Sequence, residues 1–173
     1  MTDQTPDAEL PLYATWGFTD PEWGLLVGLP QSVLVAASAA SPDSARKTRA
    51  EAEAGVVAIS DGRGSASPLV AEIARQIVAR AGDPDLGEEP PVIAPADPVA
   101  YAQDVVGRAA EANALLVTKA ERADAETYKH WLVEIAESVV GAASTGGLLG
   151  LGGETVTASE RAFRDDLAEA LAD

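Results

Sequence analysis

The sequence predicts an all-α protein, a single-domain bundle of about six helices. Three observations predict this fold: apolar residues recur every three or four positions, capping residues mark the helix starts, and no segment alternates strictly between apolar and polar residues. A chain of 173 residues suits one compact domain with a substantial core. We expect residues 1–18 to form an N-terminal tail and aromatic arm, and residues 19–173 to form the helical domain.

The first predicted helix covers residues 20–40 and bends at Pro30. Thr19 and Glu22 have the spacing of a capping box, in which each side chain bonds the other residue's backbone N–H. Residues 23–42 carry no charge over the length of a membrane span. Their proline, serine, alanine and glycine content gives little gain on transfer into lipid. We therefore expect a buried central helix, and a membrane-associated protein only if this segment faces lipid.

Three further helices are predicted over residues 42–61, 67–81 and 97–118. Each begins with a capping side chain followed by proline, which fits the first helical position because its missing N–H has no partner there. The pairs are Ser41-Pro42, Ser67-Pro68 and Asp97-Pro98. Residues 82–96 carry four prolines and no apolar period, so we expect a long Pro-rich, acidic surface loop.

The last two helices are predicted over residues 124–144 and 158–172. The first of them has the clearest apolar stripe of the chain, which runs through Tyr128, Trp131, Ile135 and Val139. A glycine-rich stretch, residues 146–153, separates the two helices. It follows a helix rather than a strand, lacks a lysine and lacks the spacing of known phosphate-binding loops, so a helix end and tight turn explain it better than a ligand loop.

Composition limits the function. Twelve Lys and Arg against 28 Asp and Glu give a net charge of −16, which argues against binding to nucleic acid or to an anionic membrane surface. This acidity is also typical of a salt-adapted organism. The absence of cysteine excludes disulfides and thiolate chemistry. The N-terminal residues have no signal-peptide pattern, so we expect a cytoplasmic protein.

An aromatic cluster near the N-terminus suggests an interface. It continues into a track of small residues along the first helix, where a second helix can approach closely. Either the arm closes over its own bundle, or it docks onto a partner or a second copy. The candidate interface residues are Tyr13, Trp16, Phe18, Trp23, Gly24 and Gly28.

The only histidine lies among glutamates at helical spacing. Glu126, His130, Glu134 and Glu137 share one face of the predicted helix 124–144, which makes them a weak candidate for a proton relay or a metal site. A solvated charged face explains them better, because one imidazole and loose carboxylates bind a divalent ion weakly. We predict no catalytic residue, no metal site and no cofactor.

Two parts of the chain resemble an uncharacterised prokaryotic all-helical family. Trp131-Leu132, Ile135-Ala136 and Val139, then the glycine-rich stretch, then Ser159-Glu160, are similar to its C-terminal pattern W-L-x-x-I-A, G-G-F-L-G-F-G, S-x-x-E. Leu148 and Leu151 stand where the pattern has phenylalanine. The resemblance implies a helical fold and no established activity.

The sequence thus favours a non-enzymatic helical interaction or assembly module that binds another protein or a second copy of itself. The alternative is a protein, with an enzyme included in this class, that binds a small molecule or a metal in a pocket near Tyr128, Trp131 and residues 146–153. The identity of a small-molecule ligand does not follow from the sequence.

Overall fold

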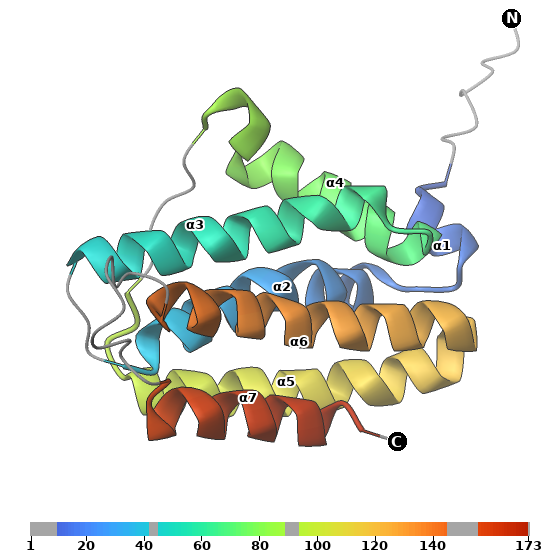
Figure 1. Cartoon of the computed structure of the whole chain (residues 1–173). Coiled ribbons are helices and arrows are strands. Elements are labelled where there is room, and N and C mark those ends of the chain that lie inside the picture. The colour runs from blue at the N-terminus through green and yellow to red at the C-terminus, as the bar shows by residue number, and fades with distance from the viewer. Residues whose placement is uncertain (1–9, 42–44, 89–93, 145–155, 173) are drawn as a thin grey trace, which may run out of the picture.

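The fold is known from a computed structural model, which describes residues 10–41, 45–88, 94–144 and 156–172. Within these ranges the chain forms seven α-helices and two short 3₁₀ helices, with no strand (Figure 1). The predicted all-α, single-domain bundle is therefore confirmed. The helices are α1 Leu12–Thr15, α2 Asp20–Ala39, α3 Ala45–Asp61, α4 Pro68–Ala81, α5 Pro98–Lys119, α6 Arg122–Ser144 and α7 Ala158–Ala170; the 3₁₀ helices are η1 Gly62–Gly64 and η2 Pro84–Leu86.

The six long helices correspond to the six predicted ones. Five of the six starts lie within two residues of the predicted ones, and the start predicted at residue 42 for α3 lies outside the described residues, which resume at Ala45. The capping box at Thr19 is confirmed, because its backbone N–H donates to Glu22 at 2.8 Å. The predicted caps Ser67 and Asp97 are confirmed as well, since each side chain accepts a backbone N–H of the first turn of its helix. The predicted Pro42 lies outside the described residues, and α7 begins with a further capping box in which the Thr157 N–H donates to Glu160 at 2.7 Å. The seventh helix, α1, was not predicted because it is a single turn without a side-chain cap.

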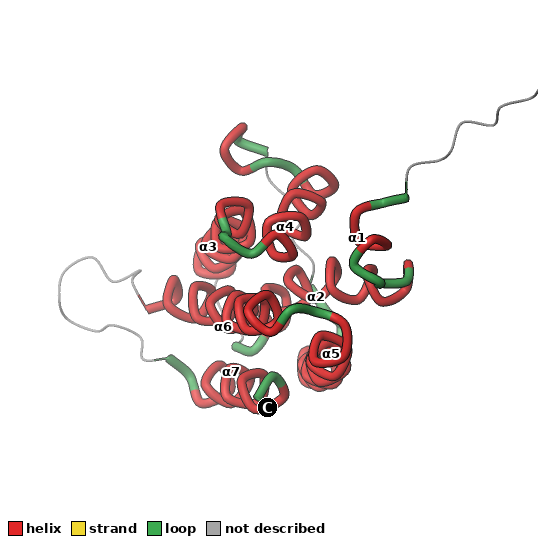
Figure 2. Tube along the Cα trace, turned by 90° about the vertical axis from the view of Figure 1, so that its right-hand side faces the viewer, coloured by secondary structure: helices red, strands yellow, loops and turns green. Residues whose placement is uncertain are grey.

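The helices form three layers, each a pair (Figures 1 and 2). The outer layers are α3 with α4 and α5 with α7, and the middle layer is α2 with α6. Helix α2 contacts five other helices, α3 to α7, so it occupies the centre of the bundle as predicted. Within the described residues, none of the helices combines the length and the apolar character that crossing a bilayer requires.

A proline lies inside the central helix. Pro30 has no backbone N–H. The backbone carbonyl of Leu26, four residues earlier, therefore lacks the helical hydrogen bond that an N–H at position 30 would donate. The hydroxyl of Tyr128 on α6 donates to this carbonyl at 2.8 Å. Burial raises the pKa of the Tyr128 phenol far above its ordinary value, so the hydroxyl keeps its proton and remains a donor. A side chain of α6 thus supplies the hydrogen bond that α2 lacks at Pro30.

Two other side chains close helix ends in the same manner. The indole N–H of Trp131 donates at 3.0 Å to the carbonyl of Ala58, in the last turn of α3, where carbonyls lack helical partners. The amide of Asn113 on α5 donates at 2.9 Å to the carbonyl of Ala172, just after α7. Asn113 is half-buried, so this polar residue at the edge of the α5 apolar stripe fixes the C-terminal end of the chain.

Removal of the Tyr128 hydroxyl tests its role. Tyr128→Phe leaves the buried Leu26 carbonyl without a donor, and we expect the free energy of unfolding to fall by about 1–3 kcal/mol. Urea denaturation followed by circular dichroism measures this loss. In a Pro30→Ala background a backbone N–H again reaches Leu26, so Tyr128→Phe should cost clearly less there. Equal losses in the two backgrounds would show that the hydroxyl does not compensate for Pro30.

Candidate functional site

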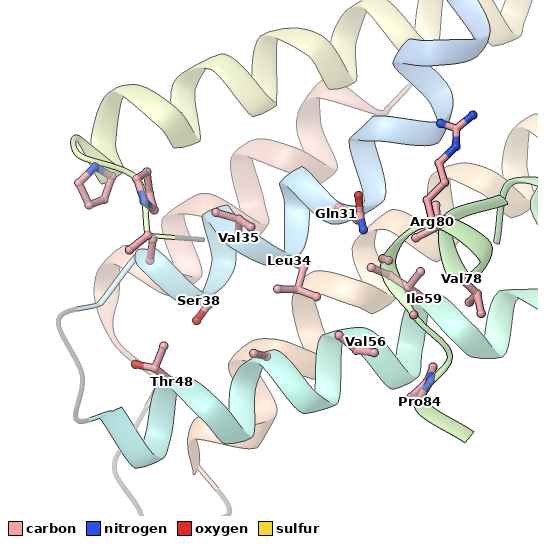
Figure 3. A pocket seen from close by; sticks show the side chains of 18 of the residues that line it. Gln31, Leu34, Val35, Ser38, Thr48, Val56, Ile59, Val78, Arg80 and Pro84 are labelled. Carbon is pink, nitrogen blue, oxygen red and sulfur yellow. The ribbon is translucent and has the colours of Figure 1, made fainter. Parts of the chain in front are cut away.

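An apolar pocket of about 480 Å³ lies between α2, α3 and α4 (Figure 3). The loop after α4 and the start of α5 complete its wall. Its lining residues, taken from the described parts of the chain, are Gln31, Leu34, Val35, Ser38, Ala39, Ser41, Thr48, Ala52, Val56, Ile59, Ile77, Val78, Arg80, Ala81, Gly82, Pro84, Ala94, Pro95 and Pro98.

Small side chains explain why the helices leave this space. Side chains normally fill a protein interior to a density without voids. Around the pocket, α2, α3 and α4 present Ala39, Ala52 and Ala81 beside larger apolar side chains. Backbones at ordinary packing distance with alanines between them leave an unfilled volume.

The pocket has its polar groups at separate places. Ser38 on α2 and Thr48 on α3 lie close to each other at one end of the view in Figure 3. Ser38 donates at 3.0 Å to the carboxyl group of Glu51, which is almost completely buried behind it and does not line the pocket. Arg80 lies at another edge, and its guanidinium extends away from Val56.

Ion pairs fix the wall that η2 contributes. Arg63 in η1 donates to Asp83 at 2.8 Å and to Asp85 at 2.7 Å, and it also bonds the hydroxyl of Ser60 at 2.6 Å. The hydrogen bond to Asp83, followed by that to Asp85, raises the pKa of the Arg63 guanidinium. The two aspartates flank Pro84, so these bonds hold that ring in place against the pocket.

The described part of the predicted aromatic arm, residues 10–18, lies against its own bundle, and residues 1–9 lie outside the described residues. Phe18 and Trp23 are each 4% exposed, and the ring of Tyr13 stacks on Trp23 with centroids 5.1 Å apart. Trp16 is half-buried beside the same indole, at 6.0 Å. The Trp23 N–H donates to Gln76 on α4 at 3.0 Å. These contacts join the aromatic residues of the candidate interface into one cluster, and they account for the short α1.

The two glycines of the candidate interface face outward. Gly24 is exposed and Gly28 is half-buried, and a Cβ atom added at either position would meet no atom within 4 Å. No described segment therefore packs against this part of the α2 small-residue track. Gly55 on α3 behaves differently, because a Cβ there would come within 2.6 Å of Leu34 and 2.9 Å of Val139.

The predicted histidine group is divided by the structure. His130, Glu134 and Glu137 line a broad open hollow of about 790 Å³ together with the edge of Trp131. Glu126 does not line it, and its carboxylate pairs with Lys129 at 3.1 Å. The Nδ1 atom of His130 lies 2.9 Å from the backbone carbonyl of Glu126. In the part of the chain that the structure describes, no three potential ligands come together to hold a metal ion.

The pocket expected near Tyr128, Trp131 and residues 146–153 is not the one found between α2, α3 and α4. Tyr128 is completely buried with its hydroxyl engaged, whereas Trp131 borders the hollow at His130. Residues 146–153 of the glycine-rich stretch lie outside the described residues. The apolar pocket was missed by the sequence analysis, although the alanines on α2, α3 and α4 are a signal for it in retrospect.

Comparisons with protein-family models, with curated proteins and with solved structures found no match for this chain. The resemblance to an uncharacterised helical family therefore stays a prediction, and the proposals below depend on the geometry of the chain itself.

The hydrogen bonds of Glu22, in the first turn of α2, make the stability of the protein depend on pH. Glu22 accepts hydrogen bonds from Lys119 at 2.7 Å and from the Thr19 N–H at 2.8 Å, and these lower its pKa from 4.5 to about 2. Because the folded-state pKa lies below the unfolded one, the stabilisation is complete above the unfolded pKa of 4.5 and disappears as the pH falls towards 2.

We therefore expect Glu22→Gln to be less stable than the unmodified chain at neutral pH. The difference should shrink steadily as the pH falls below 4.5. Urea denaturation at a series of pH values measures it. Glu111→Gln, an exposed position on α5 with no ion pair among the described residues, serves as the control, and its small effect should not follow this profile. A pH-independent difference for Glu22→Gln would contradict the assigned bonds.

Proposed function

We propose that the protein binds a small, predominantly apolar molecule in the pocket between α2, α3 and α4. One observation carries the proposal: the pocket has a volume of about 480 Å³ and is lined by apolar side chains with a few polar groups. Ligand sites in proteins have volumes of roughly 300–1,000 Å³ and the same kind of lining. This is the small-molecule alternative of the sequence analysis, transferred to a different place in the fold.

The lining favours binding over catalysis. Among its described lining residues there is no histidine and no carboxylate. The carboxyl group of Glu51, to which the Ser38 hydroxyl donates, is almost completely buried and does not line the pocket, so the lining offers no acid–base group to a ligand. The groups present instead suit a role in which apolar contact supplies affinity and hydroxyls orient the ligand.

Filling the pocket tests the proposal. Octanol serves as an uncharged apolar probe, and isothermal titration calorimetry measures its dissociation constant. Ala52→Phe places a ring inside the lining, and we expect at least about a tenfold weaker affinity for octanol, which corresponds to the loss of a modest apolar contact area.

Ala50→Phe is the matched control for this experiment. Ala50 lies on the same helix but is exposed and does not line the pocket, so octanol affinity should not change. Unfolding curves of both variants show whether the fold is retained. The proposal fails if octanol does not bind the unmodified chain, or if the two variants lower its affinity equally.

A second candidate function is self-association through the outer face of α2. It is favoured by the open space at Gly24 and Gly28, because glycines on an uncovered helix face permit a second helix to approach closely. The segment before α2 adds apolar surface at the same end of the bundle, since Leu10 and Leu12 are 70% and 47% exposed. A second copy of the chain is the proposed occupant.

Light scattering after size-exclusion chromatography tests this candidate. We expect the unmodified chain to form a dimer, and Gly24→Arg to shift it towards monomer because a long charged side chain then occupies the contact. Gly107→Arg, at an exposed glycine of α5 that also has no neighbour within 4 Å, should leave the dimer intact. A monomeric unmodified chain excludes the candidate and leaves the pocket proposal unaffected.

A further inference from the structure

We infer that the ligand of the apolar pocket is an anionic amphiphile, an aliphatic carboxylate whose head group is bound by Arg80. The inference rests on the proposed function, because it needs the pocket to be a ligand site. It adds the chemical class of the ligand and its orientation in the pocket.

The charge of the lining is the first observation. Of the 173 residues of the chain, 28 are acidic, yet none of the described residues that line the pocket is. Arg80 is the only charged residue among them. The described lining thus carries a single charge, which is positive and lies at Arg80. An anion that the protein repels elsewhere is therefore attracted at this edge.

The lack of a partner for Arg80 is the second observation. Most described basic side chains of this acidic protein are paired, for example Arg63 with Asp83 and Lys119 with Glu22. Within the described residues, Arg80 has no hydrogen bond and no ion pair. Two other arginines, Arg122 and Arg161, share this state, but neither lines the pocket. Arg80 therefore keeps its donors available at the edge of an apolar cavity.

The arrangement of polar groups sets the orientation of the ligand. Arg80 is exposed, and in Figure 3 its guanidinium extends away from Val56. The hydroxyl end, at Ser38 and Thr48, has no charged lining residue, and the Ser38 hydroxyl already donates to the buried carboxyl group of Glu51. A carboxylate at Arg80 accepts paired N–H bonds in the planar geometry that a guanidinium provides, and its aliphatic chain extends inward over the apolar lining.

Calorimetry with a charged and an uncharged probe of equal length tests the inference. Octanoate and octanol are titrated into the full chain and into Arg80→Gln. For the unmodified chain we expect octanoate to bind about tenfold more tightly than octanol, the ratio that one charge-assisted hydrogen bond provides. Arg80→Gln should lower octanoate affinity about tenfold and change octanol affinity by less than about twofold.

Two control variants separate ligand binding from a structural role. Arg80 lies in the last turn of α4, where a positive charge also stabilises the helix end. A purely structural role affects both probes alike and shows in the unfolding curve, whereas a ligand role affects octanoate alone. Arg80→Lys keeps the charge and should retain part of the preference for octanoate. Arg122→Gln removes an unpaired exposed arginine elsewhere and should leave both affinities unchanged.

The outcomes distinguish the two proposals. If octanol binds as tightly as octanoate, or if Arg80→Gln weakens both probes equally, the anionic ligand and its contact with Arg80 are overturned while the apolar pocket remains a binding site. If neither probe binds, the proposed function fails together with the inference. A loss of octanoate affinity in Arg122→Gln would show that net charge, rather than the pocket edge, determines the preference.

Discussion

The hydrogen bond between Tyr128 and the carbonyl of Leu26 is the constraint on which the rest of the bundle depends. Helix α2 is the central element, and Pro30 removes one of its hydrogen bonds in the most deeply buried part of the molecule. An unsatisfied carbonyl there costs about 1–3 kcal/mol, a large part of the stability of a small domain. Because its donor comes from α6, the bond fixes the two helices of the middle layer relative to each other. The second half of α2, which follows Pro30, then supplies one wall of the pocket.

Small residues have opposite consequences at neighbouring positions of α3. At Gly55 the missing side chain lets α3 approach Leu34 and Val139 so closely that an added Cβ would overlap both. One turn earlier, Ala52 lines the pocket together with Ala39 and Ala81 and with larger apolar side chains such as Leu34, and space remains there. A small residue therefore permits tight packing where a neighbouring side chain moves into the space that it leaves, and contributes to a cavity where none does.

The distribution of charge gives the pocket its chemical character. Surface ion pairs contribute little to stability individually, but they determine which basic side chains already have an acidic partner. Arg63 is engaged by two aspartates, and in this way it holds the η2 segment next to the pocket. Arg80 has no such partner among the described residues, and it lies where the lining contains no acid. In a chain with a net charge of −16, an arginine without an acidic partner beside an apolar cavity favours the binding of an anion at that edge of the pocket.

The sequence by itself determined the helices of this protein, because caps and apolar periods are local signals. Thr19 with Glu22 and Thr157 with Glu160 lie within one turn of each other, so their pattern predicts the helix starts directly. Only the tertiary structure decided where the aromatic arm lies, since the stacking of Tyr13 on Trp23 and the bond from Trp23 to α4 join segments that no local pattern relates. The pocket was likewise beyond the sequence. Its walls come from three helices, the loop after α4 and the start of α5, and which of their residues face one another is decided by the packing of these segments rather than by any one of them.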